Sequence, residues 1–188
     1  MRKLLLIVDP QIDFINGTLP VKGARPAMDN LAKYIECCGE DYEMCVITAD
    51  WHPYNHLSFV ENGGRWPSHC VAFSKGAAIY PPVYEAALRC CKSTKVLTKG
   101  LANNHEEYSI FANDVSTAIL DVILKSQKID IVDICGLSGD ICVSDTLEDG
   151  IHKYGTYKFN VLTQFSPSLD GGERLNEIIS KHHLSCDR

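Results

Sequence analysis

Ile131-Val132-Asp133-Ile134-Cys135-Gly136-Leu137-Ser138-Gly139-Asp140-Ile141-Cys142-Val143 is the stretch that decides the expected fold. Its apolar first part predicts a buried strand, its two glycines predict a sharp turn, and Cys142 stands where a new helix is expected to begin. A strand, a turn and a helix in succession form the repeating unit of a parallel sheet that is covered by helices. The rest of the chain can be placed around this unit.

Cys142 is the candidate nucleophile. A thiol at a helix N-terminus faces unpaired backbone N–H groups and the positive end of the helix dipole, and both favour the thiolate. An ordinary cysteine, with a pKa of about 8.5, is only a few per cent thiolate at neutral pH. Asp140 is expected to cap the helix, and its charge opposes a thiolate, so a cation is needed nearby. The alternative is inert packing, because cysteine is among the most buried residue types.

The composition indicates one globular domain over residues 1–188. Of the 188 residues, 45% are hydrophobic and 22% are charged, enough for a core that buries roughly two-thirds of the unfolded surface. The formal net charge of −6 argues against a nucleic-acid or anionic-membrane partner. The partners that remain are small molecules or a second copy of the chain, as a homo-oligomer.

The terminal segment and the cysteines favour a cytoplasmic protein. No apolar segment approaches the ~20 residues that a membrane span needs, and Met1–Asp9 is too short for a signal peptide. The nine cysteines are odd in number and include the neighbours Cys37-Cys38 and Cys90-Cys91. Reduced thiols are therefore expected in place of a disulfide framework.

Continuous apolar runs alternate with helical periodicity along the whole chain. This alternation predicts a three-layer α/β/α sandwich with a central parallel sheet, because a strand that is buried on both faces is apolar throughout. The expected strands are Lys3–Asp9, Glu43–Thr48, Lys95–Thr98, Ile129–Cys135 and Lys158–Thr163.

Three helices are expected to bury an apolar stripe. One stripe is Met28, Leu31, Ala32 and Ile35, and a second is Val115, Ala118, Ile119, Val122 and Ile123. The last helix is expected to open at Asp170, with Glu173 completing a capping box. Its buried residues are Leu175, Ile178 and Ile179.

The residues directly after the strands are unusual, and ligands of an open parallel sheet bind there. Asp9 ends the first strand, and Lys99 follows the third. Taken alone, a lysine at such a place is usually a solvated surface residue. If the fold brings Lys99 beside Cys142, however, its ammonium favours the thiolate and offsets Asp140. Asp9 beside the same thiol could carry a proton from the thiol to a leaving group.

A candidate metal site follows the second strand. Asp50 and His52 are two residues apart in Asp50-Trp51-His52-Pro53, and His69 returns after a loop that contains two glycines. One carboxylate and two imidazoles suit Zn²⁺ or Fe²⁺ with positions left open for water or substrate. An Asp-x-His pair also occurs by chance, so solvated turn residues are the alternative. His56 is either a further ligand or a group that supports the ligands.

These residues, in their order and spacing, make the chain resemble the pyrazinamidase-type nicotinamidases among the isochorismatase-like cysteine hydrolases. The resemblance runs from residue 4 to about residue 163. Within this superfamily, the aspartate-histidine metal motifs are specific to the nicotinamidase branch. The motifs are Asp9-x-Gln11-x-Asp13-Phe14, Asp50-Trp51-His52-Pro53, Trp66-Pro67-x-His69-Cys70, Lys99-Gly100, Tyr108-Ser109-x-Phe111 and Gly136-Leu137-x-x-Asp140-x-Cys142-Val143.

The resemblance implies hydrolysis of nicotinamide, or pyrazinamide, through a cysteine thioester to nicotinate and ammonia, in NAD salvage. Asp9, Lys99 and Cys142 would be the catalytic triad. One divalent ion would be held by the predicted metal ligands and would coordinate the pyridine nitrogen; zinc is expected, with iron or manganese as alternatives.

The same resemblance assigns residues around the substrate. Phe14 and Trp66 would sandwich the ring, although core packing is their alternative role. The peptide between Leu137 and Ser138 would be cis, and the N–H groups of Ser138 and Cys142 would face the oxyanion.

The chain departs from the family pattern at several positions. Ser138 stands where alanine is usual, and Gly139 where a larger residue is common, which predicts a more flexible turn. Thr163-Gln164-Phe165 replaces a Thr-Asp-Ala sequence, so Phe165 either enters the site or packs beneath it. A sixth strand is expected to be missing or reduced to Leu184-Ser185-Cys186.

Three other functions are weighed against this one. The first is an amidase of the same superfamily that acts on another small heteroaromatic or ureido amide, and the predicted metal site argues against it. The second is a non-catalytic binding relative, and the joint presence of Asp9, Lys99 and Cys142 argues against loss of activity. The third is a flavodoxin-like nucleotide binder, but the chain lacks a glycine-rich phosphate loop after the first strand.

Overall fold

The computed structural model describes residues 1–186, so the last two residues of the predicted domain 1–188 lie outside the described residues. Six strands form one sheet in the order β3-β2-β1-β4-β5-β6, and each neighbouring pair is parallel. The strands are β1 (Lys3–Val8), β2 (Tyr42–Asp50), β3 (Thr94–Lys99), β4 (Ile131–Gly136), β5 (Phe159–Val161) and β6 (Ser185–Cys186).

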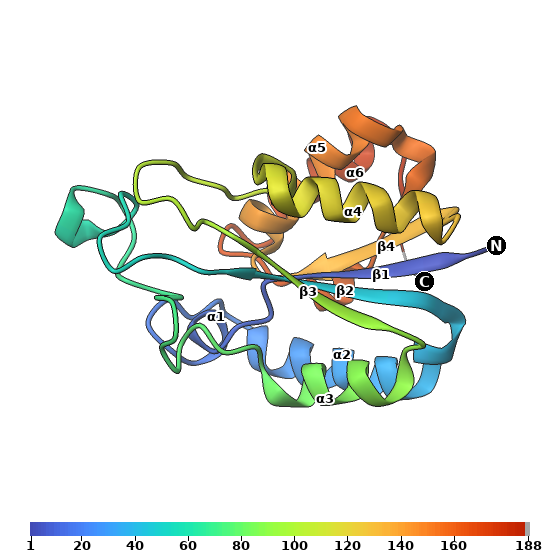
Figure 1. Ribbon diagram of the computed structural model, residues 1–188, viewed down its shortest axis with the longest axis horizontal. Coiled ribbons are helices and arrows are strands. Elements are labelled where there is room, and N and C mark those ends of the chain that lie inside the picture. The colour runs from blue at the N-terminus through green and yellow to red at the C-terminus, as the bar shows by residue number, and fades with distance from the viewer. Residues whose placement is uncertain (187–188) are drawn as a thin grey trace.

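Helices cover both faces of this sheet, which confirms the predicted three-layer α/β/α sandwich (Figure 1). On one face lie α1 (Ile12–Ile15), α2 (Ala24–Cys38) and α3 (Pro81–Cys90). On the other face lie α4 (Asp114–Ser126), α5 (Ser144–Tyr154) and α6 (Glu173–His182).

The central strand β1 explains why its sequence is apolar without a break. Side chains alternate between the two faces of a strand. Leu5 and Ile7 pack with the α2 and α3 side chains, whereas Leu4 and Leu6 pack with those of α4, α5 and α6. Both faces of β1 are therefore buried, as expected for a parallel sheet covered on both sides.

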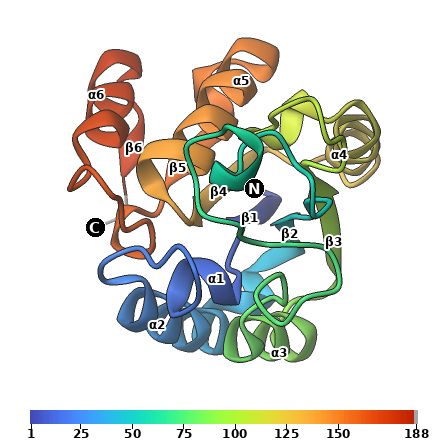
Figure 2. The same cartoon turned by 90° about the vertical axis from the view of Figure 1, so that its left-hand side faces the viewer.

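The strand order places the carboxyl ends of β1 to β4 next to one another. Strand β1 lies between β2 and β4, so the chain extends the sheet in one direction through β2 and β3 and in the other through β4. This reversal of strand order creates a crevice at the carboxyl edge. The loops that follow the strands cover this edge (Figure 2).

All five predicted strands exist, with some ends displaced. The fifth is shorter than predicted, because 3₁₀ turns at Thr156–Lys158 and Thr163–Phe165 flank Phe159–Val161. The sixth strand is reduced to Ser185–Cys186, which pairs with β5.

The predicted stripe of α4 is wrong at Val115, Ala118 and Val122, but Ile123 is buried as predicted and Ile119 packs against the core. Val115 and Val122 are exposed, whereas the buried face consists of Ser116, Leu120, Ile123 and Leu124. The buried polar member explains the displaced stripe: the Ser116 hydroxyl donates to the Thr98 carbonyl at 2.8 Å. A hydrogen-bonded serine can occupy a core position that apolar periodicity assigns to another residue.

The two other predicted stripes, on α2 and α6, are confirmed, but α6 begins later than predicted. Gly172 is the N-cap residue, and Glu173 is the first helical residue instead of the third after the cap. Asp170 still stabilises this end, because its carboxylate accepts hydrogen bonds from the backbone of Gly172 and Arg174. Within residues 1–186, none of the helices combines the length and the apolar character that a membrane crossing requires.

Leu6→Ala tests the two-sided burial of β1. Leu6 is 1% exposed, so the shortened side chain leaves a cavity and the free energy of unfolding is expected to fall by about 2–5 kcal/mol. Urea unfolding followed by circular dichroism measures it. Val122→Ala on the exposed side of α4 is the control, with an expected change within about 0.5 kcal/mol. Equal losses in the two variants would contradict the assigned core.

Candidate active site

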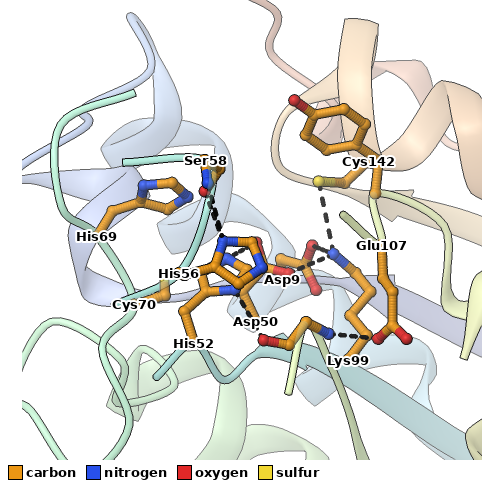
Figure 3. A network of polar contacts seen from close by, with 12 residues as sticks. Asp9, Asp50, His52, His56, Ser58, His69, Cys70, Lys99, Glu107 and Cys142 are labelled. Atoms are coloured by element: carbon orange, nitrogen blue, oxygen red, sulfur yellow. Dashed lines mark hydrogen bonds and ion pairs between the residues drawn. The ribbon is translucent and has the colours of Figure 1, made fainter. Parts of the chain in front are cut away.

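Three strand ends bring the predicted catalytic side chains together. Asp9 directly follows β1, and Lys99 is the last residue of β3. Cys142 lies in the turn between β4 and α5. Figure 3 shows the Lys99 ammonium between the two aspartates and the thiol. These residues are far apart in sequence, yet their side chains meet at the carboxyl edge of the sheet.

The Lys99 ammonium is the centre of this cluster. Its Nζ lies 2.8 Å from Asp9 Oδ2 and 2.5 Å from Asp50 Oδ1. The same Nζ lies 3.6 Å from the sulfur of Cys142. Lys99 is fully buried, and a buried ammonium requires such partners because removal from water disfavours its charge.

Charge attraction outweighs burial at Lys99 and Asp50. Burial lowers the pKa of Lys99, but Asp50, Asp9 and Cys142 raise it to well above its ordinary value. Burial raises the pKa of Asp50, but Lys99 and His52 bring it below its ordinary value. Both groups are therefore charged at neutral pH.

Burial opposes the thiolate form of Cys142, which Lys99 favours. Burial raises the pKa of this thiol well above its ordinary value, more than Lys99 lowers it, and the two aspartates raise it further. The physical reason is the charge balance: two carboxylates and one ammonium already leave the buried cluster negative. The sulfur is consequently a neutral thiol until its proton is accepted by a neighbour.

The prediction that Asp140 caps the helix after the turn is wrong. Its carboxylate accepts the backbone N–H groups of Leu169 and Asp170, at 3.0 and 3.1 Å, and does not cap α5. Cys142 lies in a π-helical turn, Gly139–Val143, that runs into α5 at Ser144. The sulfur therefore lies one step before the helix instead of at its first residue.

Asp9 has the geometry of a proton acceptor for this thiol. Its Oδ1 accepts a hydrogen bond from the Thr48 hydroxyl at 2.6 Å. Its Oδ2 is buried and, beyond the ion pair with Lys99, receives no hydrogen bond that meets normal geometry. Burial raises the pKa of Asp9 more than Lys99 lowers it. A carboxylate with a raised pKa and an unsatisfied oxygen is a suitable base.

Asp50, His52 and His69 form the metal-binding candidate. One ligand atom from each lies within 4.8 Å of those of the other two. The Nδ1 atoms of His52 and His69 lie 3.0 and 2.8 Å from the carbonyls of Gly100 and Pro67. Because these carbonyls hold the proton on Nδ1, each Nε2 is left with a free lone pair. The donor set therefore fits one divalent cation.

His56 is engaged away from this site. Its Nδ1 accepts the Ser58 backbone N–H at 3.3 Å, so Nε2 carries the proton and faces the His105 carbonyl at 3.1 Å. Its ring packs against that of His52, with 4.2 Å between the centroids. This geometry favours the supporting role over ligation.

Two side chains near β1 fix the backbone that carries the metal-binding candidates. The Gln11 amide accepts from the Asp50 N–H and donates to the Asp50 carbonyl, both at 2.8 Å. Asp13 Oδ2 accepts the N–H of Cys70, next to His69, at 2.7 Å. These contacts explain why both residues belong to the motif that follows β1, although sequence reasoning gave neither of them a role.

Gly100 is needed because His52 approaches its backbone. A Cβ at Gly100 would lie 2.4 Å from Cε1 and 2.5 Å from Nδ1 of His52, and its φ of +70° also favours glycine. The Gly100 N–H donates to Glu107 Oε2 at 2.5 Å. The residue after β3 thus orients His52 through its carbonyl.

A pocket opens beside the cluster. Its lining includes the two predicted ring contacts, Phe14 and Trp66, together with Ser138 and Cys142. The Trp66 indole donates to the Tyr108 hydroxyl at 3.0 Å. The aromatic walls suit a small heteroaromatic ligand.

Sequence reasoning missed several residues of this wall. Tyr108 was quoted within a motif but given no role, and Glu106 was not singled out, although both follow β3 in the Lys99 loop. Burial and Asp50 raise the pKa of Glu106. The remaining residues carried no chemical signal, because they are aliphatic: Leu19, Val21, Ile141 and Leu169.

The structure shows where the residues that depart from the family pattern lie. The Leu137–Ser138 peptide is cis, as the resemblance implies. Phe165 is buried against Tyr34 of α2, with 5.2 Å between the rings, so it packs beneath the site, whereas Gln164 is exposed. The flexibility expected at Gly139 stays a prediction; the residue itself is tightly enclosed, because a Cβ there would lie 2.4 Å from the Ser166 carbonyl oxygen.

Comparison with known proteins relates this geometry to one family. The family model described as "Isochorismatase domain" matches residues 3–154. The nicotinamidase of Acinetobacter baylyi is 34% identical over 173 residues, which cover 80% of this chain and 77% of that protein.

Solved structures agree with this similarity. The pyrazinamidase of Pyrococcus horikoshii in complex with zinc aligns with a TM-score of 0.83 and 28% identity, covering 100% of this chain and 99% of that one. PnC1 from L. infantum in complex with nicotinate aligns with a TM-score of 0.83 and 29% identity, covering 100% and 92%.

Lys99→Met tests the ammonium at the centre of the cluster, in protein stripped of metal by a chelator. The variant leaves two buried carboxylates without their cation, so the free energy of unfolding at pH 7 is expected to fall by about 3–5 kcal/mol. Burial then raises both carboxyl pKa values above those of the unfolded chain, and the folded state binds more protons. Stability is therefore expected to recover as the pH falls from 7 to 5.

Urea unfolding at the two pH values measures this recovery. Lys92→Met is the matched control, because Lys92 pairs with Glu43 at the exposed surface, at 3.0 Å, and little change in stability is expected at either pH. A Lys99→Met deficit that is equal at pH 7 and pH 5 would argue against the assigned charges.

Proposed function

The chain belongs to the isochorismatase domain family, and we propose that it is a nicotinamidase, which hydrolyses nicotinamide to nicotinate and ammonia through a cysteine thioester. The product nicotinate would enter NAD salvage. The observation that carries the proposal is the buried Lys99 ammonium, which pairs with Asp9 and lies 3.6 Å from the Cys142 sulfur at the wall of an aromatic pocket.

The pocket supports a planar aromatic amide as the substrate. Phe14 and Trp66 are assigned to the ring, and the sulfur of Cys142 to the carboxamide carbon. Asp50, His52 and His69, which share this pocket, would lie beside the ring nitrogen. Their position distinguishes a pyridine or pyrazine amide from an amide without a ring nitrogen.

Asp50, His52 and His69 would hold one divalent ion, with zinc proposed and iron or manganese accepted by the same donor set. When bound, this ion supplies a Lewis acid that fixes the ring nitrogen and withdraws electron density from the ring. The chain itself prepares the ligands, because the Gly100 and Pro67 carbonyls orient the two imidazoles.

In the first half of the reaction, Asp9 accepts the proton of the Cys142 thiol as the sulfur attacks the amide carbon. The negative charge that develops on sulfur and oxygen is offset by Lys99, 3.6 Å from the sulfur. We assign the oxyanion to the backbone N–H groups of Ser138 and Cys142, two residues of the pocket wall.

The tetrahedral intermediate then collapses with cleavage of the carbon–nitrogen bond. Asp9 returns its proton to the departing nitrogen, which leaves as ammonia, and the acyl group remains on sulfur as a thioester. In the second half, Asp9 accepts a proton from the attacking water. The water oxygen bonds to the acyl carbon, the carbon–sulfur bond breaks, and the proton restores the thiol.

The cysteines support a reducing, cytoplasmic location. All nine lie within residues 1–186, where none of them forms a disulfide, and the mechanism needs Cys142 in its reduced form. A small-molecule substrate is the proposed partner, and association with a second copy stays a proposal.

Ammonia release from nicotinamide by the purified protein tests the proposed function. Cys142→Ala is expected to lower kcat by at least about 10⁴-fold, because the thioester cannot form. Cys37→Ala, at an exposed position of α2, is the matched control and is expected to retain full activity. Turnover that survives in Cys142→Ala would contradict the assignment of Cys142 as the nucleophile. A wild-type protein that binds metal but releases no ammonia would favour a non-catalytic binding protein.

Metal analysis tests the proposed ligands. The purified protein is expected to hold about one divalent ion per chain, and His69→Ala is expected to hold substantially less, because one of three ligands is lost. His152→Ala, on the exposed surface of α5, should retain the wild-type content. Full metal occupancy in His69→Ala, measured by elemental analysis after gel filtration, would exclude this residue from the site.

A further inference from the structure

The turn that carries the nucleophile also holds the segment 166–170. The Gly139 N–H donates to the Pro167 carbonyl at 2.9 Å. The buried carboxylate of Asp140 accepts the N–H groups of Leu169 and Asp170 at 3.0 and 3.1 Å. Two consecutive residues of the turn therefore bind three residues of the segment.

Close packing at Gly139 strengthens this attachment. A Cβ there would lie 2.3 Å from Ser168 Oγ and 2.4 Å from the Ser166 carbonyl oxygen, so the segment occupies the space of a side chain. Arg174 holds Asp140 from the other side, because its Nη1 donates to the Asp140 carbonyl at 3.0 Å. The segment is thus attached to the turn that carries Cys142.

This attachment brings Leu169 to the rim of the reaction pocket. Leu169 lines the pocket together with Ser138, Ile141 and Cys142. It is 45% exposed, so its side chain is accessible at the mouth of the pocket. A half-exposed leucine at the mouth of a pocket is placed to contact a ligand.

An outer hollow lies on the far side of this rim. Leu169, Ile141, Trp66 and Tyr108 line both the reaction pocket and the outer hollow. The charged groups of the hollow have partners: Arg174 pairs with Asp145, and Asp140 and Asp170 accept backbone N–H groups. Arg65 lies over the Trp66 ring, 4.2 Å from its centroid. The shared boundary is therefore mostly aromatic and aliphatic, and suits an alkyl group better than a charged one.

We propose that Leu169, positioned by Asp140, limits the size of the ring that the reaction pocket accepts, and that the outer hollow would receive a ring substituent if Leu169 were shortened. The proposal rests on the proposed function and names a specificity-determining residue for it. The ligand class is pyridine-3-carboxamides with a small alkyl substituent. Asp140 is a positioning residue, because it holds the backbone of the segment 166–170, which carries Leu169.

Leu169→Ala tests the size limit, with nicotinamide and its four ring-methylated isomers as substrates. We expect kcat/KM for at least one isomer, relative to nicotinamide, to rise about tenfold or more over the wild-type ratio, the usual effect of one methyl group in an apolar pocket. Leu88→Ala, 55% exposed on α3, is the control and should keep the wild-type ratios. If kcat/KM relative to nicotinamide rises for none of the isomers in Leu169→Ala, the proposal is overturned.

Asp140→Asn tests the positioning role, because asparagine retains one acceptor oxygen and loses the other. We expect KM for nicotinamide to rise more than kcat falls. The isomer favoured by Leu169→Ala is expected to gain in kcat/KM relative to nicotinamide in this variant as well. A fall in kcat with unchanged KM and unchanged ratios would overturn the link through Leu169. Hydrolysis of nicotinamide by the wild type, measured first, tests the proposed function separately from these ratios.

Discussion

The ammonium of Lys99 has no access to water, and two carboxylates and a thiol surround it. Moving these charges out of water costs several kcal/mol for each ion, so the cluster is stable only when all of its partners are present in good geometry. The fold meets this requirement at the carboxyl ends of four strands, β1 to β4, which are neighbours in the sheet. The site and the sheet therefore depend on the same arrangement.

Asp50 connects the two parts of the site. One of its oxygens contacts the Lys99 ammonium, and the other lies 3.6 Å from His52 Nε2. The carboxylate thus belongs both to the charge balance around the thiol and to the candidate metal ligands. Gln11, in the loop after β1, fixes the backbone of Asp50, so this loop holds the carboxylate between the two parts.

The turn after β4 has two structural tasks. It presents Cys142 to Lys99, and through Gly139 and Asp140 it holds the segment that carries Leu169. The charge of Asp140, which seemed from its sequence position to oppose a thiolate, is instead used by two backbone N–H groups of that segment. The effect of the Asp140 charge on Cys142, two residues away, therefore depends on the groups that surround the Asp140 carboxylate.

The sequence by itself determined the alternation of strands and helices, because burial on both faces makes a parallel strand apolar throughout. It also determined the residues at the strand ends, since polar groups there interrupt apolar runs. Periodicity failed on α4, where a hydrogen bond buries Ser116. Only the tertiary structure decided the protonation of Cys142, the direction of Asp140 and the aliphatic wall at Leu169, because each depends on charges or contacts from distant segments that local sequence does not encode.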